Sequence, residues 1–128
     1  MTRKHRLGDL QLAIMHVLWE HGEAAVADVH RALVEERGLA PTTIATMLAK
    51  METKGVVGHR SEGRRYLYRP LVSESDVRRT MVDELTRGLF EGNAVALVSH
   101  LLSEHEIDRD DLDELRELIE RRQEEEAS

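Results

Sequence analysis

Residues 40–55 read A-P-T-T-I-A-T-M-L-A-K-M-E-T-K-G and have the apolar spacing of an amphipathic helix. The apolar positions fall at i, i+3, i+4 and i+7, the stripe with which a helix faces a core; they are Ile44, Met47, Leu48 and Met51. Pro41 suits the first turn of a helix, and Gly55 suits the residue just after its end. The segment therefore predicts one helix packed on the rest of a domain.

The opposite face of this helix is slim and rich in hydroxyl groups. It carries Thr42, Thr43, Thr46, Ala49, Lys50 and Thr53, with Lys54 just beyond. A helix in a DNA major groove, about 12 Å wide, needs small outward side chains, since Thr and Ala can meet thymine methyl groups and Lys can reach guanine or phosphate. The pattern predicts a DNA-binding face, although an ordinary surface helix could share it. The residues expected to contact DNA here are Thr42, Thr43, Thr46, Lys50 and Lys54.

Two further helices are predicted before residue 40. Asp9 can cap the first and Gly22 can end it; its inward face is Leu10, Ala13, Ile14, Val17 and Leu18, with Trp19 also expected in the core. The second ends at Gly38, and its inward face is Val29, Ala32 and Leu33. Residues 23–26 can pair as a short strand. Two helices joined by a tight glycine-containing turn form the helix-turn-helix pattern.

The period changes after Gly55, because residues 56–60 and 64–69 alternate as two short strands do. Ser61-Glu62-Gly63 is predicted to be the turn between them. An arginine-bearing hairpin directly after a recognition helix is the arrangement of a wing that contacts DNA phosphates. It predicts contacts from Arg60, Arg64 and Arg65, although an exposed arginine cluster without a partner would give the same pattern.

The charge is divided between two halves. The chain has a net charge of −7, but residues 1–72 hold 11 basic and 8 acidic residues, whereas residues 73–128 hold 7 and 17. Residues 41–69 hold six basic residues and two acidic ones, so the field around the predicted DNA-binding helix is positive. The asymmetry indicates two functional halves, of which the first suits nucleic acid.

Residues 73–128 predict an all-helical second half. Ser73-Glu74-Ser75-Asp76 resembles a capping box, Gly92-Asn93 interrupts the helix that follows, and Asp108 with Asp111 opens the last one. Arg121 to Ser128 is charged, and we expect it to fray. The three helices carry more apolar residues than so small a unit can bury. A homodimer is therefore expected, through Val77, Met81, Leu85, Leu97, Val98, Leu101, Leu102, Leu112, Leu115 and Ile119.

The predicted fold class is mainly α with a small β-hairpin wing. A winged helix-turn-helix DNA-binding domain spans residues 1–72, and an all-α dimerisation domain spans residues 73–128. Two-fold symmetry would place two DNA-binding helices about one helical turn of DNA apart. The acidic half would then set the spacing of the half-sites without touching DNA.

Other classes of protein are disfavoured. The absence of cysteine excludes disulfides, thiolate metal sites and a cysteine nucleophile. No Gly-rich phosphate loop, nucleophile elbow or H-E-x-x-H motif occurs, so we predict no enzyme, no catalytic residue and no cofactor. His16 with His21, or His100 with Glu104, can share a helical face, but neither pair brings a third ligand, and no metal site is predicted.

The sequence also argues against a membrane protein. No apolar run approaches the roughly 18 residues of a membrane span. The basic start, Met1 to Arg6, is not followed by the apolar core of a signal peptide. We therefore expect a cytoplasmic protein with no membrane partner.

Three segments occur in an order that is far more specific than any one of them. They are L-G-D-L-Q-L-A-I-M-H-V-L-W from residue 7, P-T-T-I-A-T-M-L-A-K-M-E-T-K-G-V-V from residue 41 and G-R-R-Y-L-Y-R-P from residue 63. In that order they resemble the penicillinase-repressor family, which includes BlaI, MecI and copper-responsive CopY types. The resemblance covers nearly the whole chain.

The resemblance implies a sequence-specific DNA-binding transcriptional repressor that acts as a homodimer on palindromic operators, in an antibiotic- or stress-response system. Carried over by position, Thr42, Thr43, Thr46 and Lys50 would lie on the base-reading helix, and Arg60, Arg64 and Arg65 on the wing. The alternative from the residues alone is a winged-helix module that binds an acidic protein without sequence-specific DNA binding. Discrimination between operator and scrambled duplex would separate the two, because only base-edge contacts create it.

This chain departs from the family pattern at two places. The CopY type senses metal through a C-terminal cysteine cluster, so the absence of cysteine excludes thiolate copper sensing here. The β-lactam-responsive members are inactivated by a protease at an Asn-Phe bond, and His100-Leu101 stands at that position. The resemblance thus leaves an inactivating protease open as a partner, and it does not fix the inducer.

Overall fold

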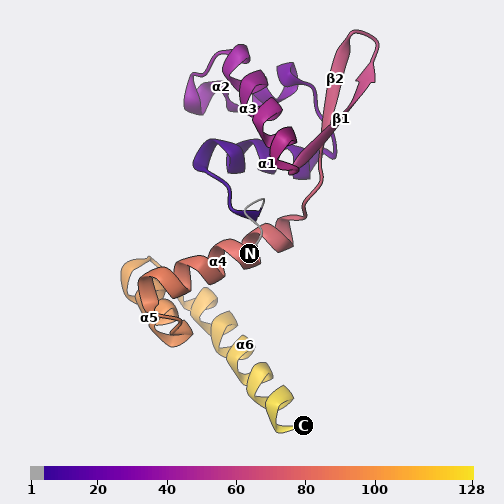
Figure 1. Cartoon of the computed structure of the whole chain (residues 1–128). Coiled ribbons are helices and arrows are strands. Elements are labelled where there is room, and N and C mark those ends of the chain that lie inside the picture. Colours follow the sequence, from indigo (N-terminus) through magenta and orange to yellow (C-terminus); the bar gives the residue numbers. More distant parts are fainter. Residues whose placement is uncertain (1–4) are drawn as a thin grey trace. The chain divides into compact units, whose positions relative to one another are not determined.

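The computed structural model describes residues 5–128, so the first four residues of the basic start lie outside it. The chain divides into two compact units, Met1–Glu84 and Leu85–Ser128. The elements in order are α1 (Asp9–His21), α2 (Val26–Arg37), α3 (Pro41–Lys54), β1 (Val57–Glu62), β2 (Arg65–Pro70), α4 (Glu74–Phe90), α5 (Ala94–Glu104) and α6 (Arg109–Ala127) (Figure 1). This order confirms the predicted fold class of a mainly helical chain with one hairpin. Among the described residues, no helix has the length and apolar character that a bilayer crossing requires.

The ends of α1, α2 and α3 follow from their flanking residues. Pro41 stands in the first turn of α3, and Gly55 follows its last residue with a φ of +88°, a left-handed conformation that glycine adopts at little cost. Gly38 ends α2 as predicted. The prediction that Asp9 caps α1 is wrong, because Gly8 is the N-cap and Asp9 is the first helical residue. The Asp9 carboxylate instead accepts a hydrogen bond from Arg37, at 2.8 Å.

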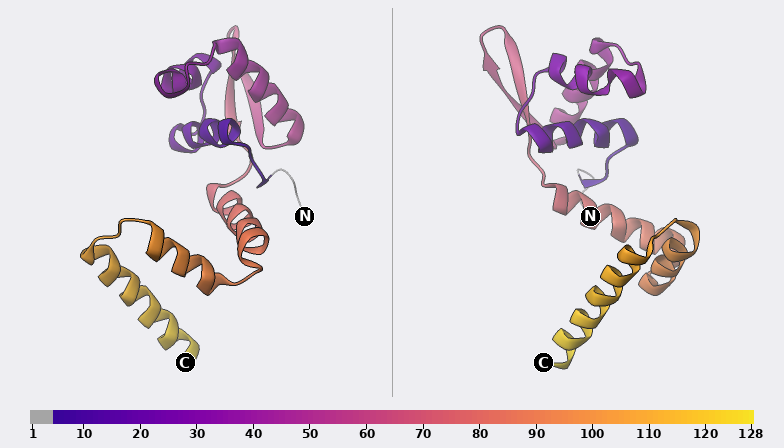
Figure 2. Two further views of the ribbon diagram at one scale, coloured as in Figure 1. Left: turned by 90° about the vertical axis from the view of Figure 1, so that its left-hand side faces the viewer. Right: turned by 180° about the vertical axis from the view of Figure 1, so that it is seen from behind.

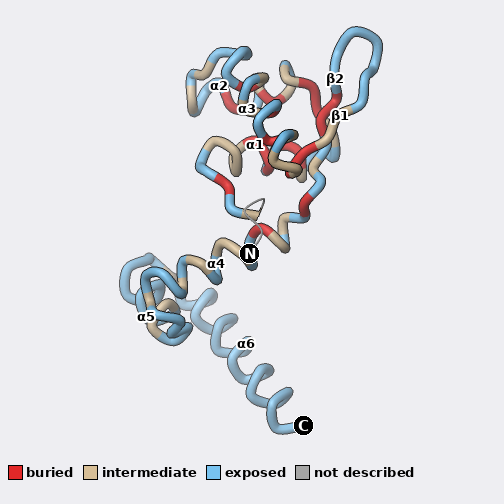
Figure 3. The backbone as a smooth tube through the Cα atoms, in the orientation of Figure 1, coloured by how far each residue is buried: buried red, intermediate tan, exposed pale blue. Residues whose placement is uncertain are grey.

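The core of the first unit lies where α1, α2, α3 and the base of the hairpin meet (Figure 3). Ile44, Leu48 and Met51 are wholly buried, at 0% exposure, and Met47 packs against them. The predicted apolar stripe of α3 is therefore confirmed. Trp19 is only partly buried, and its indole N–H donates a hydrogen bond to the carbonyl of Val72, at 2.9 Å.

The hairpin pairs β1 with β2 in antiparallel register, from Val57 opposite Pro70 to Glu62 opposite Arg65. The predicted turn at residues 61–63 is wrong, because the loop is Gly63 and Arg64 alone. Gly63 has a φ of +62°, and two-residue hairpin loops require such a positive φ to match the twist of their strands. The strand expected at residues 23–26 shrinks to a single bridge between Ala24 and Tyr68. Figure 2 shows the hairpin tip projecting beyond the three helices.

The first turns of α4 complete the core of the first unit. Ser73 caps the helix by accepting a hydrogen bond from the backbone N–H of Asp76, at 3.0 Å, as predicted. Val77 is 2% exposed and belongs to the core, and Met81 packs against it. The apolar side chain of Val77 is thus already covered within its own chain, which removes it from the predicted dimerisation residues. The boundary between the two compact units lies inside α4, after Glu84, and not at residue 73, just before that helix begins.

The second unit has well-defined helix ends and no buried residue in α5 or α6 (Figure 3). Asn93 caps α5 by accepting from the N–H of Ala96, at 3.0 Å, and Asp108 caps α6 by accepting from that of Asp111, at 2.8 Å, both as predicted. The expected fraying of Arg121 to Ser128 is wrong, because α6 continues to Ala127.

Candidate nucleic-acid interface

The outward face of α3 is open to solvent over its whole predicted length. Thr42, Thr43, Thr46 and Lys50 are all exposed. Within residues 5–128, no hydrogen bond or ion pair engages the ammonium of Lys50. This face therefore offers small polar side chains and one unpaired cation.

Lys54, at the end of α3, has a different environment from Lys50. Its ammonium donates a hydrogen bond to the backbone carbonyl of Arg6, at 2.6 Å, and the residue is half-buried. The lysine thus holds the segment before α1 against the end of α3. The structure thus gives Lys54 a packing role that the sequence, which grouped it with the DNA-contacting residues, did not reveal.

The register of the hairpin separates its side chains into two faces. Glu62 pairs with Arg65 and Arg60 with Leu67, so these side chains lie on one face, because residues opposite one another in a ladder point the same way. His59 pairs with Tyr68 on the other face, where Tyr66 also lies. The wing therefore has one charged face and one aromatic face.

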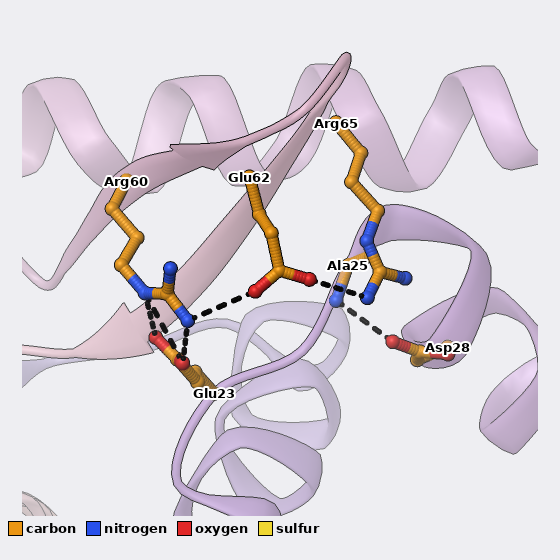
Figure 4. A network of polar contacts seen from close by, with 6 residues as sticks. All are labelled: Glu23, Ala25, Asp28, Arg60, Glu62 and Arg65. Atoms are coloured by element: carbon orange, nitrogen blue, oxygen red, sulfur yellow. Dashed lines mark hydrogen bonds and ion pairs between the residues drawn. The ribbon is translucent and has the colours of Figure 1, made fainter.

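Ion pairs hold the charged face of the wing (Figure 4). Arg60 donates to Glu23 through Nη2 at 2.7 Å and through Nε at 3.1 and 3.2 Å, so it ties β1 to the segment between α1 and α2. Glu62 accepts from Arg60 at 3.3 Å and from Arg65 at 3.1 Å. Two arginines and two glutamates thus form one network with no net charge. Two of the three arginines predicted to bind phosphate are already paired with carboxylates.

The pairing keeps both carboxylates ionised. A hydrogen bond from Arg60 lowers the pKa of Glu23 from 4.5, and one from Arg65 lowers that of Glu62 from 4.5. The hydrogen bond to Glu23 likewise raises the pKa of Arg60. Glu23 is partly buried, and Arg60, Glu62 and Arg65 are exposed. The pairs therefore compete with water and salt and are open to exchange with a phosphate.

Arg64 differs from its neighbours because it lies in the loop at the wing tip. It is exposed, and no residue in the described part of the chain pairs with it. Next to it, a hollow of about 520 Å³ lies between the start of α2, Ala45 of α3 and the wing. Its remaining lining residues are Ala25, Val26, Ala27, Arg64, Arg65, Tyr66 and Tyr68. Small side chains on one wall and arginines on the other leave room for an anionic backbone.

The aromatic face fixes the base of the wing on α3. The His59 ring stacks on Tyr66 with centroids 4.1 Å apart, and its Nδ1 lies 2.6 Å from a carboxylate oxygen of Glu52 in the last turn of α3. No sequence motif marks Glu23, Glu52 or His59 as residues of this site. Only Glu62 had a local signal, because it stands two residues after Arg60 on the same strand face.

His16 and His100, each part of a pair that could share a helical face, contact residues other than their possible co-ligands. The Nδ1 atom of His16 lies 3.6 Å from a carboxylate oxygen of Glu74, and the His100 ring lies 5.8 Å from that of Phe90. Residues 5–128 contain no group of three or more His, Cys, Asp or Glu side chains that could hold a metal ion.

Three helices around one core, the third with a slim exposed face and followed by an arginine-bearing hairpin, define a winged-helix DNA-binding protein. Over residues 7–121 the sequence matches the family described as penicillinase repressor. The chain belongs to this family and is a transcriptional repressor, as the sequence resemblance implied.

Several relatives align with the chain along most of its length. It is 27% identical to the penicillinase repressor of Bacillus licheniformis over 120 residues, which are 94% of each chain. It is 33% identical to the transcriptional regulator BlaI of Mycobacterium tuberculosis over 121 residues, 93% of this chain and 86% of the relative. The solution structure of the DNA-binding domain of the repressor BlaI matches with a TM-score of 0.52 and 34% identity, over 59% of this chain and 93% of that domain.

Proposed function

We propose that the chain represses transcription as a homodimer bound to a palindromic operator. In this proposal the exposed face of α3 contacts base edges through Thr42, Thr43, Thr46 and Lys50. The wing contacts phosphates, with Arg64 as its unpaired cation. The second unit joins two copies, so that two α3 helices face successive major grooves on one side of the DNA.

One observation supports the dimer above all others, namely that the second unit has almost no interior of its own. None of the residues of α5 or α6 is buried. Ten large apolar side chains in the unit are between 37% and 77% exposed, namely Leu85, Leu89, Val95, Val98, Leu101, Leu102, Leu112, Leu115, Leu118 and Ile119. An apolar surface of this extent on so small a unit is typical of an interface that another chain covers.

The test of the dimer is sedimentation equilibrium of the full chain with and without Leu101→Asp. A charge placed in an apolar interface has no partner there, so we expect the wild type to be dimeric and the variant to shift toward monomer. Ser103→Asp is the matched control, because it places the same charge on the opposite face of α5. A monomeric wild type, or equal effects of the two substitutions, would contradict the proposal.

Sequence-specific recognition is tested separately from dimerisation. Duplexes selected by the purified protein from a random pool supply the operator, and binding is then compared with that of a scrambled duplex. We expect preference for the selected duplex, since the α3 face carries groups that can distinguish bases. Equal binding of both would favour the alternative of a protein-interaction module.

We further propose that release from DNA follows from breaking the dimer. A proteolytic cut between Asn93 and Glu104 would separate α6 from the DNA-binding unit, and with it Leu112, Leu115 and Ile119. Mass spectrometry of the protein from induced cells tests this step. An intact chain under inducing conditions would point to a ligand or to altered expression.

A further inference from the structure

We propose that Glu62 limits the affinity of the wing for DNA of any sequence, because it holds the guanidinium groups that would otherwise bind phosphates. The inference rests on the proposed DNA binding. The wing is expected to promote DNA binding. The charge of Glu62, which lies near its tip, would oppose that binding.

The geometry makes Glu62 the link between the two arginines (Figure 4). One carboxylate oxygen accepts from Arg60 and the other from Arg65, at 3.3 and 3.1 Å. A phosphate that approaches either guanidinium must displace this carboxylate or share the arginine with it. In both cases a negative charge stays beside the phosphate, and binding of the duplex is weakened.

The two arginines depend on Glu62 to different degrees. Arg60 keeps its bidentate contact with Glu23 if Glu62 is lost. Arg65 has no other hydrogen-bond partner within residues 5–128, although the nearby charge of Asp28 is close enough to interact with it. Removal of the Glu62 charge should therefore release Arg65 above all, while the wing stays tied to the rest of its unit through Arg60.

The effect should fall on phosphate contacts and not on base recognition. The exposed residues of α3 expected to meet bases, Thr42, Thr43, Thr46 and Lys50, include no carboxylate. Phosphate contacts contribute equally to operator and random DNA and weaken as salt rises. Glu62 thereby lowers the amount of repressor that random genomic DNA can hold.

The experiment titrates a random-sequence duplex with the full-length protein at several salt concentrations, so it does not require a known operator. Glu62→Gln should tighten binding about two- to tenfold at 0.1 M salt and steepen the salt slope by about one, the effect of one additional phosphate contact. Glu35→Gln is the matched control. It makes the same change of charge on α2, at an exposed side chain without a hydrogen bond or ion pair in the described chain, and it should change binding little.

A double-mutant cycle assigns the gain to the masked arginine. Arg65→Gln should weaken binding less in the wild type, where Glu62 already holds this arginine, than in Glu62→Gln, where it should abolish the gain. Arg64→Gln, which removes the unpaired arginine beside it, should weaken binding in both backgrounds. Glu62→Asp keeps the charge and should bind as the wild type does.

The outcomes separate this inference from the function on which it rests. Glu62→Gln binding that is unchanged or weaker overturns the inference, and so does a gain that persists after Arg65→Gln. A wild-type chain that binds neither random nor selected duplexes overturns the proposed DNA binding itself, and the inference with it.

Discussion

Val77→Ala should destabilise the winged-helix unit and leave dimerisation unchanged. Val77 lies in α4, whose apolar spacing suggests a place in the dimer interface. In the structure it is 2% exposed and packs in the core with residues of the first unit. The substitution therefore distinguishes a core residue from an interface residue within one helix.

The size of the effect follows from the burial. Valine to alanine removes two methyl groups, each worth about 0.8 kcal/mol when taken out of water. The cavity left in a packed core adds to this loss. We expect the free energy of unfolding of this unit to fall by about 2 kcal/mol. With a urea m-value of about 1 kcal/mol/M for a small domain, the unfolding midpoint should fall by about 2 M.

The assay follows the fluorescence of Trp19, the single tryptophan, during urea unfolding of the full chain. Trp19 reports on the first unit because its indole N–H is bonded to Val72 within it. Val95→Ala is the control, because Val95 is 77% exposed in the second unit and should leave this transition unchanged. A Val77→Ala variant with an unchanged midpoint and a weakened dimer, by sedimentation equilibrium, would refute the assignment of Val77 to the core.

Three further predictions concern DNA binding, assembly and acid stability. Thr46→Ala should lower the preference for a selected duplex over a random one by about 1–3 kcal/mol, whereas Arg64→Ala should weaken both alike and reduce the salt slope by about one. If salt-dependent titrations show that Arg64→Ala loses the preference and Thr46→Ala keeps it, the assignment of base recognition to Thr46 and phosphate contact to Arg64 is reversed. A fragment of residues 1–84 should be monomeric by sedimentation equilibrium and bind operator DNA far more weakly, since it lacks the avidity of two linked half-sites; a dimeric fragment would contradict this. Because a hydrogen bond from Arg37 lowers the pKa of Asp9 from 3.8 in the folded chain, this pair stabilises the fold at neutral pH and ceases to do so as pH falls through the folded value. The urea midpoints of wild type and Asp9→Asn should differ at pH 7 and converge in acid, and a difference independent of pH would exclude the ion pair as its cause.

The fragment is extended to residue 84 because the early part of α4 belongs to the first unit. Residues 1–72, the domain predicted from the sequence, would lose Val77 from the core. Such a fragment would be destabilised for a reason unrelated to dimerisation. Its weak DNA binding would then not distinguish loss of the dimer from loss of the folded core.

The sequence alone predicted those features that depend on neighbouring residues. The start and end of α3 are set by Pro41 and Gly55, and the last two helices are capped by Asn93 and Asp108. Such helix ends are determined by a few neighbouring residues. The exposed hydroxyl face of α3 followed in the same way from the period of a helix. Even the error at the hairpin turn was local, since Gly63 was recognised as a turn residue but assigned to the end of the loop instead of its start.

Only the tertiary structure decided which neighbours these side chains meet. The period of α4 shows that Val77 is on an apolar face, but the same pattern fits a core and a dimer interface. The pairing of Arg60 with Glu23 joins residues 37 positions apart, and the bond from Lys54 to the Arg6 carbonyl joins residues 48 apart. Hydrophobic periodicity specifies which face of a helix must be covered. It does not specify whether the same chain or a second chain covers that face. Ion pairing depends on distances that the fold alone establishes, because Coulomb energy between exposed groups is small beyond direct contact.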